Sequence, residues 1–372
     1  MKQTTVVVVG CGGMGAGHAN LLAKMPECKV VAVCDKNLAL AQKVADGIGC
    51  GAGDDFAALL AKHKPDAASV CTDNRSHAPL AKIAVAAGVR GLMVEKPMAV
   101  QPADAREMVA ACAKNNVVLA VNHQRRLGAD LVEMKRLMDG GAIGTIRHMR
   151  MACPGDFLSD GTHMVDSAQF LTGDQTPLWI QAMLHRDLDF IKIKWKADSQ
   201  THRPGWRFGH VVESGLTAVW QIENGPRVEA VGGDFLQEYT VYQDYLVEGS
   251  KGWLWRAGDV LGKNLFICDG EDGRLMPDKK DWPYQPRDNE KGPWKKVELP
   301  ASAEKSNANA IILAYRALVK SMADGSPHPM SGDIALKDFE IVTAAYESAR
   351  LGKRLALPAA QDRFPLELMF DE

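Results

Sequence analysis

Glu95, Lys96 and Pro97 place a carboxylate, an amine and a proline in consecutive positions directly after an apolar run, residues 91–94. The run predicts a short buried strand, and the proline favours an extended conformation at the lysine before it. Ligands of an open α/β sheet bind just beyond the carboxyl ends of its strands, so a charged pair that ends a strand is well placed for chemistry. By itself the tripeptide favours a solvated surface turn, because short motifs match by chance, but the rest of the chain reverses that interpretation.

A glycine-rich loop follows the β-branched run 6–9 and precedes a helical pattern over residues 16–24. This G-x-G-x-x-G pattern between a strand and a helix permits a tight turn and lets the backbone approach a pyrophosphate. The helix N-terminus adds free N–H groups and a partial positive charge for that anion. We therefore expect a dinucleotide here, held by Gly10, Gly12, Gly13, Met14 and Gly15.

An aspartate follows the second predicted strand, residues 30–34, about 20 positions beyond the glycines. Asp35 stands where a carboxylate binds the 2′-hydroxyl of the adenosine ribose. Because a carboxylate repels a 2′-phosphate, NAD is favoured over NADP as the cofactor. The neighbouring Lys36 weakens this preference a little.

Strand and helix patterns alternate up to residue 122, which predicts a doubly wound parallel sheet. Two further strands, 67–71 and 117–121, are expected to end at the same sheet edge as the glycines, and polar residues follow each of them. His77, a single histidine after the first of these strands, would more often have a structural role than a ligand-binding one. The remaining expected cofactor contacts at this edge are Thr72, Asn74, His77, Glu95, Lys96 and Gln124.

A second candidate site lies in the helix predicted over residues 162–171, which follows a turn-rich stretch. His163 stands near the start of this helix and shares one helix face with Asp166. The histidine either projects into a cleft as an acid or base, or is a core residue bonded to the aspartate. The residue pattern leaves both interpretations open.

Beyond residue 178 the chain is rich in strands, which predicts a twisted and mostly antiparallel sheet, followed by two long helices. The predicted domains are residues 1–122 and 123–372, with the option that the C-terminal helices pack back on the first domain. All eight tryptophans lie in the second domain, as packing residues or as platforms for a sugar ring, an aryl group or a second subunit. The segment 269–297 is rich in charge, proline and glycine and predicts a long functional or mobile loop.

Composition and charge narrow the classes of function. A net charge of −2 over 372 residues gives no electrostatic reason to expect nucleic acid or an anionic membrane as a partner. No apolar run reaches the roughly 20 residues that a membrane helix needs, and the N-terminus shows no signal-peptide pattern. The eight cysteines contain no C-x-x-C pair, so we expect reduced thiols in a cytoplasmic protein and no metal site.

Taken together, these motifs make the chain similar to the Gfo/Idh/MocA family of glucose–fructose oxidoreductases, inositol dehydrogenases and rhizopine-catabolism proteins. The resemblance runs nearly end to end, and a Glu-Lys-Pro tripeptide at this distance from the glycines is its hallmark. Besides the glycine-rich loop, it is carried by Asn74-x-x-His77, Glu95-Lys96-Pro97, Arg125-Arg126, Gly140-x-x-x-Gly144, Gly161-x-His163-x-x-Asp166 and Ser348-Ala349-Arg350-x-Gly352-Lys353.

The resemblance implies a Rossmann domain and an α/β domain whose open sheet forms the far wall of the active site. The outer face of that sheet commonly makes homodimers or homotetramers in the family. The resemblance also implies NAD as cofactor and a small carbohydrate or glycoside as substrate. By position, Glu95 resembles the group that holds the nicotinamide ribose, Lys96 the catalytic lysine and His163 the catalytic histidine. Arg126 matches an arginine near the substrate or the cofactor.

One position departs from the family's pattern. Many members carry an aspartate four residues before the histidine, where this chain has Ser159, with Asp160 one step later. Either Asp160 turns into the site, or Ser159 only hydrogen-bonds, or the mechanism depends wholly on Lys96 and His163. The expected substrate contacts are Lys96, Arg126, Ser159, Asp160 and His163, and the expected catalytic residues are Lys96, His163 and Asp160.

Three functions are consistent with these residues. The first is an NAD-dependent dehydrogenase that oxidises a secondary hydroxyl of a cyclic polyol, sugar or glycoside by hydride transfer. Lys96 and His163 would bracket that hydroxyl, with His163 as base or relay and Lys96 as donor to the developing oxygen charge. The second uses the same step transiently: a 3-keto sugar acidifies the neighbouring C–H and permits elimination or glycoside cleavage, with NAD recycled. The third is a nucleotide-bound sensor without turnover.

Overall fold

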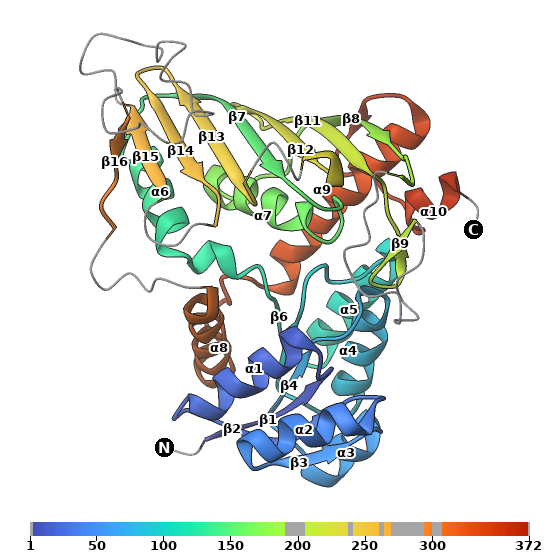
Figure 1. The fold of residues 1–372 in the computed structure, drawn as a ribbon. Helices are drawn as coiled ribbons and strands as arrows, with labels where there is room; N and C mark the ends of the chain where they lie inside the picture. Colours follow the sequence, from blue (N-terminus) through green and yellow to red (C-terminus); the bar gives the residue numbers. More distant parts are fainter. Residues whose placement is uncertain are drawn as a thin grey trace.

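Two sheets, each with its own helices, lie one above the other in the computed structural model (Figure 1). The structure describes residues 3–189, 205–236, 241–259, 264–268, 294–299 and 307–370. Most of the predicted loop 269–297, together with Trp195 and Trp282, lies outside these residues. Within the described ranges, no helix has both the length and the apolar character that crossing a membrane requires.

The first sheet has six parallel strands in the order β3-β2-β1-β4-β5-β6. Its central strands are apolar and buried on both faces, as a parallel sheet covered by helices requires. The strand order reverses between β1 and β4, and such a switch point is where open α/β sheets bind ligands. The predicted doubly wound parallel sheet is thus confirmed. Its strands are β1 (Thr4–Val9), β2 (Cys28–Cys34), β3 (Gly51–Gly53), β4 (Ala67–Val70), β5 (Gly91–Val94) and β6 (Val118–Val121).

Five helices alternate with these strands. The Asp55 side chain caps α3 by accepting a hydrogen bond from Ala58 N at 3.0 Å, as its position in the sequence indicates. The α2 helix is capped in a similar way, because Asn37 Oδ1 accepts from Ala39 N at 3.2 Å, but Gly47 interrupts its helical pattern. The β3 strand reads Gly-Ala-Gly and has little strand propensity. The helices are α1 (Gly13–Lys24), α2 (Leu38–Ile48), α3 (Phe56–His63), α4 (His77–Ala86) and α5 (Pro102–Lys114).

The second sheet has nine strands in the order β16-β15-β14-β13-β7-β12-β11-β8-β17. β7 pairs with β12 in parallel, and the other neighbours pair antiparallel, which confirms the predicted mostly antiparallel sheet. Its strands are β7 (Ile146–Cys153), β8 (Trp179–His185), β11 (Gly215–Gln221), β12 (Arg227–Gly232), β13 (Asp244–Gly249), β14 (Trp253–Ala257), β15 (Leu265–Cys268), β16 (Lys295–Lys296) and β17 (Leu355–Ala356). A separate antiparallel pair is formed by β9 (Trp206–Arg207) and β10 (His210–Val211).

Residues 211–222 have the pattern of a single strand, but in the structure they are divided between β10 and β11. The interruption falls at Glu213, whose buried carboxylate accepts hydrogen bonds from Phe157 N at 2.7 Å and from Tyr346 Oη at 2.8 Å. Burial raises the pKa of Glu213 to about 7.

Three helices, α6 (Ala129–Asp139), α7 (Gly161–Thr172) and α9 (Gly332–Leu351), pack on the face of the large sheet that is turned toward the first sheet (Figure 1). On β7, the side chains of Met149 and Met151 alternate toward these helices and are buried. The open face of the sheet therefore points away from the first sheet. Helices of this domain therefore lie between the large sheet and the first sheet.

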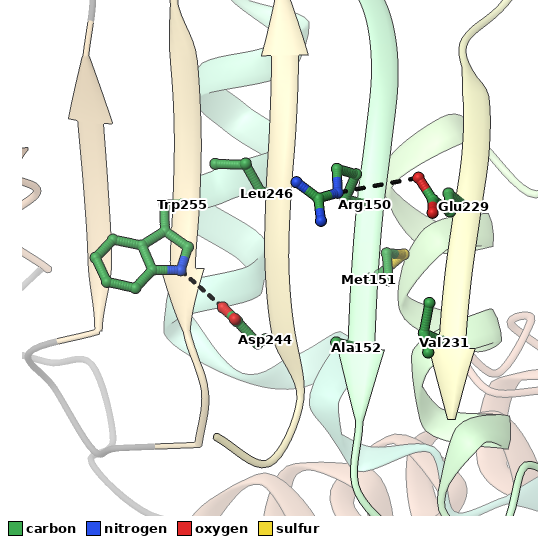
Figure 2. A pocket seen from close by; sticks show the side chains of 8 residues that line it. All are labelled: Arg150, Met151, Ala152, Glu229, Val231, Asp244, Leu246 and Trp255. Carbon is green, nitrogen blue, oxygen red and sulfur yellow. Dashed lines mark hydrogen bonds and ion pairs between the residues drawn. The ribbon is translucent and has the colours of Figure 1, made fainter. Parts of the chain in front are cut away.

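The outer face of the large sheet carries a mixture of charged and aromatic side chains (Figure 2). Arg150 on β7 lies beside Glu229 on β12, with 3.9 Å between Nε and Oε2. Trp255 Nε1 donates a hydrogen bond to Asp244 Oδ1 at 2.7 Å, and its ring stacks on Phe266 at 5.3 Å between centroids. Trp255 thus has both a hydrogen-bond partner and a stacking partner on this face.

The helix α8 (Asn307–Asp324) returns to the first sheet and contacts α1 and β5 (Figure 1). Its Tyr315 joins the same buried apolar cluster as Leu22. A β-bridge pairs Ala120 with Ser331 just after this helix. C-terminal residues thus complete the core beneath the glycine-rich loop. The remaining short elements are η1 (Asn74–Ser76), η2 (Gln124–Leu127), η3 (Asp234–Leu236) and α10 (Pro365–Met369).

Candidate active site

The glycine-rich loop between β1 and α1 leaves an open cradle. A Cβ added to Gly10, whose φ is +93°, would lie 2.2 Å from Cys71 O, and one added to Gly15 would lie 1.8 Å from Gly10 O. Packing therefore requires glycine at these two positions. A Cβ at Gly12 or Gly13 would meet no heavy atom within 4 Å, so this side of the loop is open to a ligand.

Asp35 is fixed beside this loop by backbone hydrogen bonds. Its Oδ2 accepts from Cys11 N at 2.7 Å and its Oδ1 accepts from Asn37 N at 2.8 Å. The carboxylate is thus held at the end of β2, next to the cradle, which suits recognition of a ribose hydroxyl. Met14 and Lys36 are exposed nearby.

The polar residues after β4 have structural partners. His77 Nδ1 lies 2.7 Å from Pro97 O and its Nε2 lies 3.2 Å from Thr72 O, so the buried ring links the ends of β4 and β5. Burial lowers the pKa of His77. Asn74 Nδ2 donates to Ser159 Oγ at 3.0 Å and so joins this edge to the segment before α7. His77 and Asn74 thus connect the end of β4 to the end of β5 and to the segment before α7.

Glu95 ends β5 as a buried carboxylate with two donors on one oxygen. Its Oε1 lies 3.0 Å from His18 Nε2 and accepts from Asn122 Nδ2 at 2.6 Å. Burial by itself would raise the pKa of Glu95, but the bonds and charge of His18, with Asn122, outweigh it and lower that pKa to about 2. Glu95 Oε2 has no partner in the part of the chain that the structure describes, so it is available to a ligand.

Lys96 reaches from the first sheet to the segment that precedes α7. Its Nζ donates a hydrogen bond to Ser159 O at 2.7 Å and lies 4.0 Å from Asp160 Oδ1. The side chain is 20% exposed, so it is not sealed within the core. Lys96, the predicted catalytic lysine, is therefore in direct contact with Ser159, the residue that departs from the family's pattern.

His163 occupies the first turn of α7, and its ring is buried. Burial lowers the pKa of His163 well below its usual value, and the positive charges of Arg125 and Lys96 lower it further, so the imidazole is neutral at pH 7. His163 Nδ1 has no hydrogen-bond partner among the described residues. Asp166 pairs with His123, at 3.2 Å, and not with His163. The alternative of a core histidine bonded to Asp166 is therefore not what the structure shows.

The carboxylate of Asp160 is directed toward Lys96. The hydroxyl of Ser159 binds Asn74 instead. Tyr242 Oη donates to Asp160 Oδ1 at 2.7 Å. Burial raises the pKa of Asp160, Lys96 opposes this, and the charge of Asp156 adds to it. A Cβ at Gly155 would lie 2.1 Å from Asp160 Oδ2, so a glycine is needed beside this carboxylate.

Arg126 is saturated by carboxylates. Its Nη1 and Nη2 donate to Asp174 at 3.0 and 2.6 Å, its Nε donates to Asp166, and its Nη2 lies 3.5 Å from Asp338 Oδ2. His123, Asp166 and Asp338 offer ligand atoms within 4.8 Å of one another, a spacing suited to a cation. The guanidinium of Arg126 supplies that positive charge. The structure therefore places this arginine behind the site and not at an open position for substrate.

The preceding residue, Arg125, lies closer to the candidate site. It donates from Nε to Asp259 Oδ2 at 3.0 Å, and its guanidinium lies 5.3 Å from the centroid of the Tyr242 ring. Its Nη1 is buried without a partner among the described residues, which leaves a donor for a ligand. Sequence reasoning missed Arg125 and Tyr242 as site residues, although the arginine pair and a tyrosine before a strand were visible signals.

The residues at this edge fit a dinucleotide. The cradle at Gly12 is open to a pyrophosphate, and Asp35 offers a carboxylate to the first ribose. Glu95 keeps one oxygen without a partner, and Gln124 Oε1 is a buried acceptor that no described residue satisfies. A buried amide oxygen of this kind is costly unless a ligand donates to it, and a carboxamide would.

Comparison with known proteins agrees with this geometry. Residues 4–123 match the model of an oxidoreductase family with an NAD-binding Rossmann fold, GFO_IDH_MocA. This domain belongs to the Gfo/Idh/MocA family. The predicted NAD-binding Rossmann domain is thereby confirmed over these residues, and with it NAD as the cofactor.

Relatives of the family extend the likeness over the second half of the chain. D-glucoside 3-dehydrogenase of Escherichia coli is 31% identical over 189 residues, which are 45% of this chain and 54% of the relative. D-apiose dehydrogenase of Paraburkholderia graminis is 25% identical over 392 residues, 98% of this chain and 92% of the relative. The match thus spans about half the length of the first relative and nearly all of the second.

The fold also agrees with solved structures of oxidoreductases. An oxidoreductase from Agrobacterium radiobacter, in complex with NAD+, L-tartaric acid and magnesium, aligns over 95% of this chain and 98% of its own. The TM-score is 0.73 and the sequence identity is 20%, a level at which the likeness shows the fold alone. The predicted α/β architecture is confirmed by this alignment.

Proposed function

We propose that this chain is an NAD-dependent dehydrogenase that oxidises a secondary hydroxyl of a cyclic polyol, sugar or glycoside. The observation that carries the proposal is the meeting of Lys96, from the end of β5, with the segment that leads into His163. Membership of an oxidoreductase family supports the reaction class. Relatives named glucoside 3-dehydrogenase and apiose dehydrogenase support a carbohydrate as substrate.

The nucleotide would be held by residues of the first sheet's carboxyl edge. Gly12 and Gly13 face the pyrophosphate, and Asp35 and Glu95 each offer a carboxylate to a ribose. When bound, NAD+ supplies a nicotinamide ring that accepts a hydride. Gln124 Oε1 suits the carboxamide of that ring, because it is a buried acceptor without a donor in the described residues.

The proton of the substrate hydroxyl would be handled by His163 and Lys96. A neutral His163 accepts that proton, and burial together with two neighbouring cations keeps its pKa low. Lys96 donates a hydrogen bond to the oxygen on which negative charge develops. Asp160 lies 4.0 Å from the amine and is bonded to Tyr242, so the pair orients the lysine or passes its proton onward.

Substrate contacts are assigned to residues that surround Lys96 and His163. Arg125 offers an unpartnered Nη1, and it replaces Arg126 in this role because Arg126 is bound by three carboxylates. Asp160 and Tyr242 provide further polar groups at the position where the family pattern has its aspartate. Ser159 contributes through its backbone oxygen, which accepts from Lys96, and through its hydroxyl, which binds Asn74.

We further propose a homodimer or homotetramer that forms through the outer face of the large sheet. This face carries Leu246, Val231 and Trp255 among charged residues, and the helices of its domain pack on the other side (Figure 2). A cytoplasmic location agrees with the eight free cysteines. Light scattering of the purified protein tests the assembly: a monomer at micromolar concentration would refute it.

A substrate screen tests the function. Polyols, free sugars and aryl glycosides are incubated with the protein and NAD+, and NADH absorbance and product mass are followed together. We expect NADH to accumulate with at least one neutral carbohydrate and the product to be lighter by two hydrogens. Binding of NAD+ without redox change for any compound would instead indicate a sensor.

A second candidate keeps the hydride step but returns the hydride. Oxidation at carbon 3 would acidify the neighbouring C–H and permit elimination of an aglycone. Addition of water to the resulting unsaturated ketone and return of the hydride to carbon 3 would then recover NAD+ in place. The name of the glucoside 3-dehydrogenase relative favours carbon 3 as the oxidised position. In the same screen, glycoside cleavage without net NADH identifies this reaction.

A further inference from the structure

A chain of buried polar groups runs beneath the glycine-rich loop. His18, on α1, is 1% exposed, and its Nε2 lies 3.0 Å from Glu95 Oε1. The other ring nitrogen, Nδ1, lies 2.8 Å from Tyr315 Oη. Tyr315 Oη in turn lies 2.6 Å from Ser69 Oγ on β4. This histidine therefore has a defined partner on each nitrogen.

The elements that meet in this chain are far apart in the sequence. His18 stands three positions after the last glycine of the loop, in the helix whose N-terminus faces the pyrophosphate cradle. Glu95 ends β5, and Tyr315 comes from α8, 297 positions after the histidine. One helix thus touches both the cradle and the carboxylate at the other end of the nucleotide site.

We propose that His18, held in place by Tyr315, is a positioning residue that fixes the Glu95 carboxylate for the ribose on the nicotinamide side. The proposal rests on the proposed NAD binding. With Glu95 Oε1 bound by His18 and Asn122, the rotation of the carboxylate is fixed, and Oε2 is the oxygen left for a ligand. A ribose diol supplies the donors that this oxygen lacks.

The arrangement works with either protonation state of the ring. As an imidazolium, His18 donates from Nδ1 to Tyr315, and the tyrosine then donates to Ser69. As a neutral ring with its proton on Nε2, it accepts from Tyr315, and Ser69 donates to the tyrosine. In both states Nε2–H donates to Glu95, so the carboxylate keeps its orientation.

Equilibrium binding of three nucleotides separates this role from general damage to the site. ADP carries the adenosine half and the pyrophosphate without a second ribose, ADP-ribose adds that ribose, and NAD+ adds the nicotinamide. For His18→Leu we expect the Kd of ADP-ribose and of NAD+ to rise about tenfold, while the Kd of ADP stays within about twofold. His18→Gln, which keeps a donor near Nε2, should recover part of the loss.

Two further variants keep the test decisive. Tyr315→Phe removes only the hydroxyl and preserves the core, so it should weaken ADP-ribose about threefold and spare ADP even if His18→Leu folds poorly. His328→Gln is the matched control, because His328 is another buried histidine that bonds Ala314 O beside α8 but does not touch Glu95. It should lower stability without changing the ratio of the ADP and ADP-ribose affinities.

The result that overturns the proposal is an equal change in the affinities of ADP, ADP-ribose and NAD+, or no change, in His18→Leu and Tyr315→Phe. These measurements need no sugar and no turnover. A wild-type protein that binds NAD+ but oxidises no carbohydrate would therefore refute the proposed function and leave the role of His18 testable.

Discussion

Two consecutive residues after β6 enter two different buried clusters of charge. Asn122 donates to Glu95, which also pairs with His18, and this open cluster leaves one carboxylate oxygen without a partner. His123 lies 3.2 Å from Asp166. It belongs to a closed cluster whose members are His123, Arg126, Asp166, Asp174 and Asp338.

The difference between the clusters separates binding from support. In the closed cluster the Arg126 guanidinium is shared by three carboxylates, and burial together with Asp166 raises the pKa of Asp338 well above its usual value, which limits the negative charge. In the open cluster a charged Glu95 keeps an unsatisfied oxygen at the sheet edge. The closed cluster also holds two oxygens without a partner among the described residues, Asp166 Oδ2 and Asp338 Oδ1, but both are buried.

The largest effect is expected from breaking the closed cluster. Arg126→Gln leaves buried carboxylates without their counter-ion and should lower the free energy of unfolding by about 3–5 kcal/mol. Urea denaturation measures it. Arg125→Gln is the matched control and should cost clearly less stability, because Arg125 pairs with one carboxylate, that of Asp259. Equal losses in the two variants would contradict the distinction between the clusters.

Lys96→Ala tests the contribution of the amine to turnover, next to the open cluster. Removing the amine should lower kcat by about a hundred- to ten-thousandfold, the usual contribution of an acid–base group, while the Kd of NAD+ changes little. Steady-state NADH absorbance assays measure kcat, and equilibrium binding measures the Kd of NAD+. Lys82→Ala, a surface lysine that pairs with Glu107 on α5, should leave both unchanged. Turnover that survives in Lys96→Ala would exclude the proposed role of the amine.

The open cluster should also give stability a specific pH dependence. The pKa of Glu95 is about 2 in the folded protein against an ordinary 4.5. A lowered carboxyl pKa contributes stability that is present above pH 4.5 and is lost as the pH falls toward 2, here on the order of 3 kcal/mol. The pKa of His18 is raised, with burial opposed by its neighbours, so its contribution is fully present in this acidic range.

Urea denaturation of wild type and Glu95→Gln at pH 6, 4.5 and 3 isolates this contribution. We expect the difference in unfolding free energy between the two proteins to shrink as the pH falls. A difference that stays constant would mean that Glu95 is not charged in the folded protein.

The smallest effect is expected at Arg125, for which we propose a contact with the substrate. Arg125→Gln removes the unpartnered Nη1 donor and should raise the KM for carbohydrate about tenfold, with a smaller change in kcat. The Kd of NAD+ serves as the internal control. A variant whose NAD+ affinity falls while KM is unchanged would move Arg125 from the substrate side to the nucleotide side.

The sequence predicted the strands and the glycine-rich loop of the first sheet well, because their signals are local. The glycines from Gly10 to Gly15, the aspartate at the end of β2 and the strand before Glu95 each depend on neighbours in the chain. Such features follow from backbone geometry and strand burial, which short patterns record. The same local logic failed at α2 and β3, where glycines obscured the period.

The assignment of side chains to partners could not be read from the pattern. Arg125 and Arg126 are adjacent and chemically identical, and only the fold shows that one meets three carboxylates and the other keeps a free donor. His18 and Tyr315 meet across 297 positions. Tyr242 reaches Asp160 across 82 positions, so the departure at Ser159 could not be interpreted before this contact was known.

The return of α8 to the first sheet has a consequence for synthesis on the ribosome. Leu22 and Met93 share their apolar cluster with Tyr315 and Met330, so a growing chain that has already emerged with its glycine-rich loop still exposes this surface. The nucleotide site becomes complete only when the last fifth of the polypeptide has been delivered. A fragment that stops at residue 122 should accordingly aggregate or bind chaperones, and co-expression of the C-terminal helices should rescue it.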